Sequence, residues 1–255
     1  MNFVSFVPNS NFIYMKKIIL LLVCLPFLGN AQLKDVIKKT AAKATTKNIA
    51  VSNLEIANGL KEALDNGVKK QVTKLTAVDG FYKNELVKIL LPEELKKVDS
   101  KLRMIGLGSL ADEGILMLNR AAEDAVKQST PIFIDAIKNM NFTDAKNILL
   151  GSENAATTYL QTTTNSALYE KFSPVIKASL ANVGADAVWK KIIDKYNSIP
   201  LVTKVNPDLT DYTTNKALEG VFKMITIEEK NIRSGLDSRT SALLKKVFAL
   251  QDKKK

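Results

Sequence analysis

Apolar residues recur every three or four positions along most of this chain, and that spacing limits the folds open to it more than any other feature. The first clear case follows Ser52, with apolar residues at Ile56, Leu60, Leu64, Val68, Val72 and Leu75. This spacing places the side chains on one face of an α-helix. Ser52 and Glu55 have the spacing of a capping box, which satisfies backbone donors at a helix start. The sequence therefore predicts a helix from Ser52 to about Leu75.

The same spacing continues to the C-terminus, and no β-type alternation of useful length interrupts it. Asp79-Gly80 predicts a turn. Capping residues and prolines predict further helix starts at Pro92, Thr130, Thr143, Ser152, Ser173, Asp208 and Ser238, and an aromatic-bearing helix over Trp189–Tyr196. We expect an all-α fold, a single compact multi-helix domain of roughly nine or ten helices.

Small residues stand beside the first apolar stripe, at Gly59, Ala63 and Gly67. A glycine inside a helix costs about 1 kcal/mol relative to alanine, so two of them need a structural reason. Close approach of a neighbouring helix is the simpler explanation. A groove for a ligand is the alternative.

The N-terminal region has the features of a secretory signal. Lys16 and Lys17 precede an apolar run over residues 18–28, and small residues lead up to Ala31. The run is well short of the roughly 20 residues that a membrane-spanning helix needs. We expect a signal peptide over residues 1–31, cleaved after Ala31, and export to the periplasm.

Two details of this region leave alternatives open. Met15 stands directly before the two lysines, so we expect residues 1–14 to be an upstream extension from a misplaced start codon. Cys24 is the only cysteine, and Leu21 precedes it by three positions as in lipoprotein signals, which makes lipid anchoring at Cys24 the alternative. Val23 stands where such signals carry a small residue, and this favours the plain signal peptide.

The composition excludes several classes of chemistry. The chain has no histidine, and the expected mature chain has no cysteine. Thiol nucleophiles, histidine bases, Ser-His-Asp triads and ordinary zinc sites each need an imidazole or a thiolate. Glycine-rich phosphate loops and twelve-residue calcium loops are also missing from the sequence. We therefore expect no cofactor, no metal site, no catalytic residues and a stability that does not rest on disulfides.

The chain is strongly basic, with a formal net charge of +11. Nucleic acid is the usual partner for such a charge, but export argues against it, and only four arginines are present to read bases. Residues 32–51 carry five lysines and one acid and read as a basic linker. Its possible second role is peripheral contact with an anionic membrane. The helical domain is expected over residues 52–250, followed by a lysine tail over 251–255.

The densest polar stretch is LADEGILMLNRAAEDA, over residues 110–125. On a helix, Arg120 would meet Glu123 three residues later and Asp124 four residues later, which are ordinary stabilising pairs. A polar ligand contact is the functional alternative, and its candidate residues are Asp112, Asn119 and Arg120.

A second polar cluster lies near the C-terminus. Glu229 and Arg233 have the favourable i, i+4 spacing, and Glu228 and Arg239 are close in sequence. Because the few arginines stand beside acids, we expect these pairs to lock the last two helices together. Anion or partner binding is the alternative.

Ten short blocks follow one another in a fixed order: DGF, LPEEL, LADEGILMLNRAAEDA, PIFIDAI, DAKNILLG, AATTYLQTTT, LYEKFSPVI, DLTDYTTNKALEGVF, EEKNIR and RTSALLKKVF. In this order they resemble the bacterial family known as domain of unknown function 4197. The resemblance covers nearly all of the chain after the basic linker. It implies an exported helical protein with no assigned activity, and it carries no site residue over to this chain.

Three functions from different classes remain open. The leading hypothesis is a non-catalytic helical binding or interaction module of the envelope, with an envelope protein or a small ligand as its partner. The rival is a carboxylate-dependent hydrolase of envelope glycan that uses Asp112 or Glu113, which would need two carboxylates facing each other across a cleft. The third is a structural protein held on the membrane surface by the linker.

Overall fold

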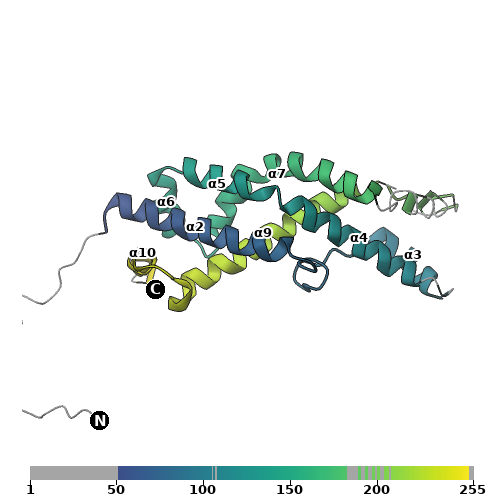
Figure 1. Ribbon diagram of the computed structural model, residues 1–255, viewed down its shortest axis with the longest axis horizontal. Helices are drawn as coiled ribbons and strands as arrows, with labels where there is room; N and C mark the ends of the chain where they lie inside the picture. Colours follow the sequence, from purple (N-terminus) through teal and green to yellow (C-terminus); the bar gives the residue numbers. More distant parts are fainter. Residues whose placement is uncertain are drawn as a thin grey trace, which may run out of the picture. The chain divides into compact units, whose positions relative to one another are not determined.

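The described part of the chain is helical throughout its regular structure (Figure 1). This computed structural model describes residues 51–182, apart from 105 and 107, and residues 189–252 with gaps at 191–192, 195–196, 199, 202–203 and 207. The predicted signal peptide, nearly all of the linker and the last three lysines lie outside the described residues. The elements are α2 (Asn53–Thr76), α3 (Glu93–Met104), α4 (Gly108–Val126), α5 (Ser129–Asn139), α6 (Phe142–Leu149), α7 (Ala155–Asn182), α9 (Thr210–Ser234), the 3₁₀ helix η1 (Leu236–Ser238) and α10 (Ala242–Asp252).

The all-α, single-domain prediction is confirmed, but the described residues contain fewer helices than the number predicted. Eight α-helices and no strand occur among the described residues, where nine or ten helices were expected. Of the helix predicted over Trp189–Tyr196, the residues 189, 190, 193 and 194 are helical and the others lie outside the described part. No helix in the described ranges is both long enough and apolar enough to cross a bilayer.

One reason for the lower count is that α7 is a single helix. The sequence predicted separate starts at Ser152 and Ser173, yet α7 continues through Pro174. Proline inside a helix costs about 3 kcal/mol through the lost hydrogen bond and the clash of its ring. The buried stripe continues across the proline with Phe172 and Ile176 on either side, and each such side chain gains about 1.5–3 kcal/mol on burial. The free energy gained by burying these side chains therefore offsets the cost of the proline.

Helix α2 forms as predicted. The Ser52 hydroxyl accepts a hydrogen bond from the Glu55 N–H at 3.2 Å, and the Glu55 carboxylate accepts one from the Ser52 N–H at 2.9 Å. The six residues of its predicted apolar stripe are all buried. They face α9, α5, α6 and α10.

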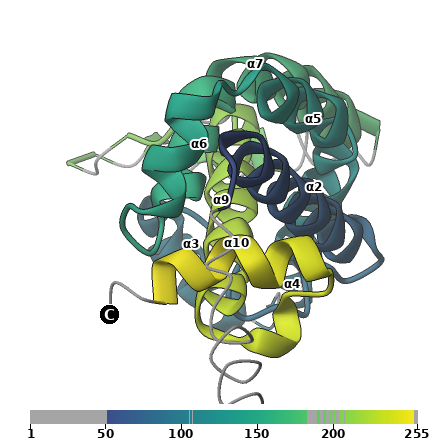
Figure 2. The same ribbon diagram turned by 90° about the vertical axis from the view of Figure 1, so that its left-hand side faces the viewer.

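Helix α9 runs through the middle of the helical domain, with α2, α4 and α7 packed around it (Figure 2). Because several of its sides are covered, α9 buries charged residues as well as apolar ones, including Glu228, Glu229 and Arg233. Its Phe222 meets Phe133 of α5 edge to face, with ring centroids 6.0 Å apart. This central position makes α9 the helix from which polar side chains reach the ends of other helices.

The starts of four helices differ from the prediction: α5 has Gln128 at its N-cap and contains the predicted Thr130, and α9 has Leu209 at its N-cap where Asp208 was predicted. Helix α6 is capped by Asn141, whose side chain accepts from the Asp144 N–H at 2.8 Å, and the predicted Thr143 lies inside the helix. Helix α10 is capped by Ser241, which accepts from the Leu244 N–H at 3.1 Å, where Ser238 was predicted. Each short connection contains several residues that can cap a helix. The packing of apolar residues in the core therefore decides which of them becomes the cap.

The glycines of α2 mark close helix contacts, which confirms the simpler of their two explanations. A Cβ atom on Gly59 would lie 2.6 Å from a methyl group of Val247 in α10. A Cβ atom on Gly67 would lie 3.3 Å from the Glu228 side chain of α9. Both helices can approach α2 this closely only because these positions carry no side chain.

Candidate functional site

The first polar cluster surrounds the loop between α2 and α3, residues 77–92, which we name the α2–α3 loop. Its Phe81 is fully buried, and Asp79 adopts a left-handed backbone conformation with φ of 68°. The Tyr212 hydroxyl of α9 donates to the carbonyl of Leu90 at 2.8 Å. The loop makes backbone hydrogen bonds within residues 77–88, and side chains of α4 supply partners for further backbone groups of the loop.

Asn119 of α4 is the main one of these partners. It is fully buried, and its side-chain oxygen accepts from the Ile89 N–H at 2.8 Å. Its amide nitrogen donates to the carbonyls of Ile89 at 2.8 Å and Ile115 at 2.7 Å. A single side chain thus satisfies both backbone groups of Ile89, as a neighbouring strand would. Asn119 holds the α2–α3 loop against α4.

Arg120 extends this attachment toward the start of the loop. It pairs with Glu123 and with Asp79, each at 2.6 Å. Glu123 is buried, and its other carboxylate oxygen accepts from the Phe81 N–H at 3.0 Å. Lys83 and then Arg120 hold the pKa of Asp79 below its usual value through hydrogen bonds. The predicted pair between Arg120 and Glu123 is therefore present and holds the loop, whereas the predicted partner Asp124 pairs with Lys127 instead.

Asp112 lies apart from these residues. It pairs with Arg103 of α3 at 2.5 Å, and this hydrogen bond holds the pKa of Asp112 below its usual value. Asp112 precedes Asn119 by two helical turns, about 10 Å along α4. The structure thus joins Asn119 and Arg120 at one loop and does not bring Asp112 to them. Ligand binding by the three residues stays a prediction.

The second polar cluster connects three helices through α9. The Glu229 carboxylate accepts from the backbone N–H groups of Ala156 at 2.9 Å and Thr157 at 2.8 Å, in the first turn of α7. Arg233 pairs with Glu229 at 2.8 Å and donates to the carbonyl of Ile148, near the end of α6, at 2.8 Å. A carboxylate at a helix N-terminus and a cation at a helix C-terminus both suit the helix dipole. This pair therefore fixes the ends of α6 and α7 on α9.

Arg239 fixes the last helix in a similar way. Its side chain is buried under Phe248 and donates to the carbonyls of Ile232 and Arg233 at the end of α9, each at 2.9 Å. It also pairs with Asp252 of α10 at 2.6 Å. The predicted locking of the last two helices is thus present in the structure.

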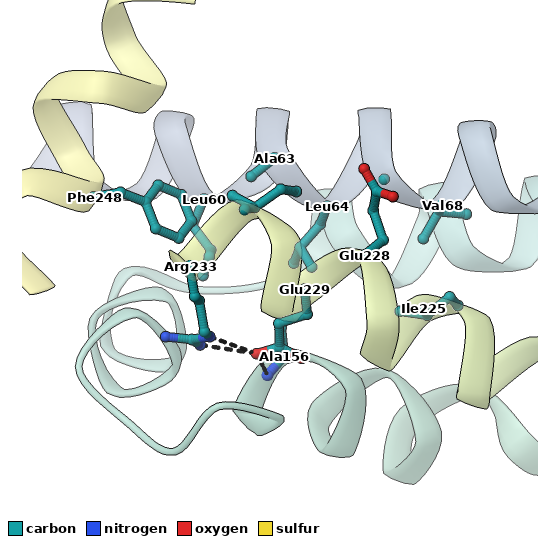
Figure 3. A pocket seen from close by; sticks show the side chains of 12 residues that line it. Leu60, Ala63, Leu64, Val68, Ala156, Ile225, Glu228, Glu229, Arg233 and Phe248 are labelled. Atoms are coloured by element: carbon teal, nitrogen blue, oxygen red, sulfur yellow. Dashed lines mark hydrogen bonds and ion pairs between the residues drawn. The ribbon is translucent and has the colours of Figure 1, made fainter. Parts of the chain in front are cut away.

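A small cavity lies between α2 and α9 beside this cluster (Figure 3). Its volume is about 20 Å³, enough for about one water molecule. Its walls are mostly apolar, with Phe248 at one end, and Glu228 is one of its acidic lining residues. Glu228 accepts from Lys70 and from Gln71, each at 2.6 Å. Its carboxylate is thus satisfied from α2.

The contacts of Asn119 and Gln71 were missed by the sequence reasoning. The sequence indicated Asn119 only as a candidate ligand contact, and its actual partner, Ile89, is 30 residues away. Gln71 falls between two residues of the α2 stripe and is almost fully buried. A polar residue next to an apolar stripe was the available signal, since a buried amide needs hydrogen-bond partners.

The chemistry open to these clusters is limited by their mutual bonding. The buried charged residues Glu123, Glu228, Glu229, Arg233 and Arg239 all bond to other protein groups. Within the described ranges, no group of three or more histidine, cysteine or acidic residues is placed to hold a metal ion. Asp112 and Glu113, the acids of the hydrolase hypothesis, are exposed on α4.

Comparison with known proteins gives one family. The family model described as a protein of unknown function (DUF4197) matches residues 50–249. No curated protein and no solved structure gives a significant match.

Proposed function

Because this chain belongs to the DUF4197 family of proteins of unknown function, we propose a function from its own residues: an exported, non-catalytic helical module of the bacterial envelope that binds an envelope protein or a small ligand. Export rests on the signal-like features of residues 1–31. Periplasmic location follows from them, with a lipid anchor at Cys24 as the alternative.

The observation that carries this proposal is the bonding of the buried charged groups. A general acid or base must reach the proton that it transfers in a bound substrate. Here the buried carboxylates of Glu123, Glu228 and Glu229 each accept at least two hydrogen bonds from protein groups. Because these carboxylates are occupied by protein groups, the bonding supports a protein that binds its partner at its surface.

Arg120 is the proposed contact residue for an anionic group of the ligand or partner. Asp79 and Glu123 fix its guanidinium, while 38% of its side chain remains exposed. A cation held in one orientation loses less entropy when it binds. Asn119 supports it by holding the adjacent loop, and Asp112 would contact the partner separately, two turns earlier on α4.

The experiment is chemical cross-linking in intact cells, followed by purification of the protein from the envelope fraction. We expect a reproducible cross-linked partner for the wild type and its loss in Arg120→Ala. Asp79→Asn is the matched control, because it weakens the attachment of the loop and keeps the guanidinium. Loss of the partner in both variants would assign the effect to the loop and would not support Arg120 as the contact residue. An Arg120→Ala variant that folds and keeps its partner would end the proposal for this residue.

The hydrolase alternative has its own test. Asp112→Asn and Glu113→Gln keep the size of each side chain and remove its charge. If purified protein releases sugars from envelope glycan and either variant abolishes the release, the non-catalytic proposal is wrong. No release of sugars by the wild-type protein, together with partner binding that persists in Glu113→Gln, supports it.

A further inference from the structure

Helix α7 lies on the outside of the helical domain in both views (Figure 1, Figure 2). Residues 154–169, which include its first half, carry no charged side chain, and no charge-free run after residue 50 is longer. Surfaces of soluble domains are usually about 25–35% charged, so solvation alone does not explain this run. We name its outer side the α7 face. It consists of the exposed Thr158, Thr162, Asn165 and Ser166 and the half-buried Tyr159 and Tyr169.

The side chains of the α7 face are suited to contact with another protein. Thr158, Thr162 and Ser166 form the outermost row of α7, because they lie four residues apart on the side opposite its buried residues. The Thr162 hydroxyl donates to the carbonyl of Thr158 at 2.9 Å, so it needs no outside partner and its methyl group can pack against another surface. The Tyr169 hydroxyl, at the edge of the face, donates to Asp211 of α9 at 2.6 Å. Few charges together with tyrosine are typical of the centre of a protein–protein interface.

The charge of the chain indicates which protein fits this face. The formal net charge is +11, so two copies of the chain repel each other in most orientations. When two copies are related by a two-fold axis, residues near the axis meet their own counterparts. A charged residue there would meet a like charge, which is unfavourable. A face without charge is therefore the surface through which this basic chain can pair with itself.

The residues that border the charge-free run are complementary in one such arrangement. Glu153 and Lys171 are both exposed, and they stand nine residues before and nine residues after Thr162. In an antiparallel pair of α7 helices that cross at Thr162, Glu153 of each copy comes opposite Lys171 of the other. A crossing angle of about 20°, which is common between packed helices, keeps both pairs close enough to interact. We propose that the protein forms a two-fold symmetric dimer through the α7 face, with antiparallel α7 helices crossing near Thr162.

The test is sedimentation velocity of the protein purified as the cell processes it, over a series of concentrations. The series extends to about 100 µM, well above the roughly micromolar dissociation constants of the weaker specific interfaces. We expect a dimer whose fraction rises with concentration. Thr162→Lys sets a lysine against its own counterpart and should weaken the dimer by at least about tenfold. Thr73→Lys, the same change at an exposed threonine of α2, is the matched control and should leave the dimer unchanged.

The antiparallel arrangement has its own test. Glu153→Lys should weaken the dimer about tenfold, because two exposed pairs change from attraction to repulsion. Adding Lys171→Glu to that variant should restore the dimer, since the two charges have then only exchanged places. A wild-type protein that stays monomeric throughout the series, or a dimer that Thr162→Lys leaves unchanged, would overturn the proposal. A dimer lost equally in Thr73→Lys would also overturn it, and failure of the exchanged pair to restore binding would exclude the antiparallel crossing. Arg120→Ala should keep the dimer, so this proposal and the proposed partner contact can fail separately.

Discussion

Replacing Asn119 with alanine removes the clamp that holds the α2–α3 loop on α4. The native side chain makes three hydrogen bonds of 2.7–2.8 Å in a fully buried position. The Ile115 carbonyl keeps its helical partner, but the N–H and carbonyl of Ile89 lose their partners in a nearly inaccessible place. Each orphaned group costs about 1–3 kcal/mol. Asn119→Ala should therefore lower the free energy of unfolding by about 2–6 kcal/mol.

Urea unfolding followed by circular dichroism measures this loss, with the free energy extrapolated to water. Asn215→Ala is the matched control, because Asn215 is an exposed asparagine of α9 that bonds only to Asp211. Its cost should stay below about 0.5 kcal/mol. Amide exchange at Ile89 should also accelerate more than exchange in α9, since the loop loses its partner first. A loss of unfolding free energy below about 1 kcal/mol for Asn119→Ala would refute the claim that Asn119 holds the α2–α3 loop on α4.

Three further predictions test other contacts. Glu229→Ala leaves its buried arginine partner unpaired and should cost about 3–5 kcal/mol in urea unfolding; a surface-like loss below about 1 kcal/mol would contradict the bridge to α7. The hydrogen bond from Lys246 lowers the pKa of Glu55 from 4.5 to about 2, so the stability from this pair is complete above pH 4.5 and is lost as the pH falls toward 2; in an NMR titration Lys246→Ala should return that pKa toward 4.5, and an unchanged value would exclude the pair. A methyl group in Gly114→Ala would overlap the indole ring of Trp189, the only tryptophan, so its fluorescence should shift to the red and stability should fall by about 1–3 kcal/mol; unaltered emission would contradict this contact.

The helices could be predicted because their information is local. The apolar stripe of α2 and its capping box depend on residues a few positions apart, and the structure has both where the sequence placed them. The close contacts at Gly59 and Gly67 were also predictable, because a glycine inside a helix stands out against its cost. Pro174 misled the prediction since the local penalty of proline is visible in the sequence and the packing that offsets it is not.

The polar clusters were less predictable because their partners are distant in sequence. The pair of Glu229 with Arg233 could be predicted from its spacing. The hydrogen bonds of the pair to the end of α6 and the start of α7, more than 70 residues earlier, could not. Asn119 looked like a polar residue at a helix boundary until the α2–α3 loop was seen to lie over it. Residues that resemble a binding site in the sequence can therefore serve in the structure to hold a loop or a helix end in place.

The central proposal, that the protein acts by binding, is tested most directly by native mass spectrometry of the protein purified gently from its own envelope fraction. The account predicts a reproducible mass beyond that of the chain, either a small ligand or a second protein, which mild denaturation releases. Added mass that stays on the N-terminal peptide would identify a lipid at Cys24 and leave the question of a partner to the remaining mass. A bare chain with no bound mass, from cells in which cross-linking also finds no partner, would contradict the account.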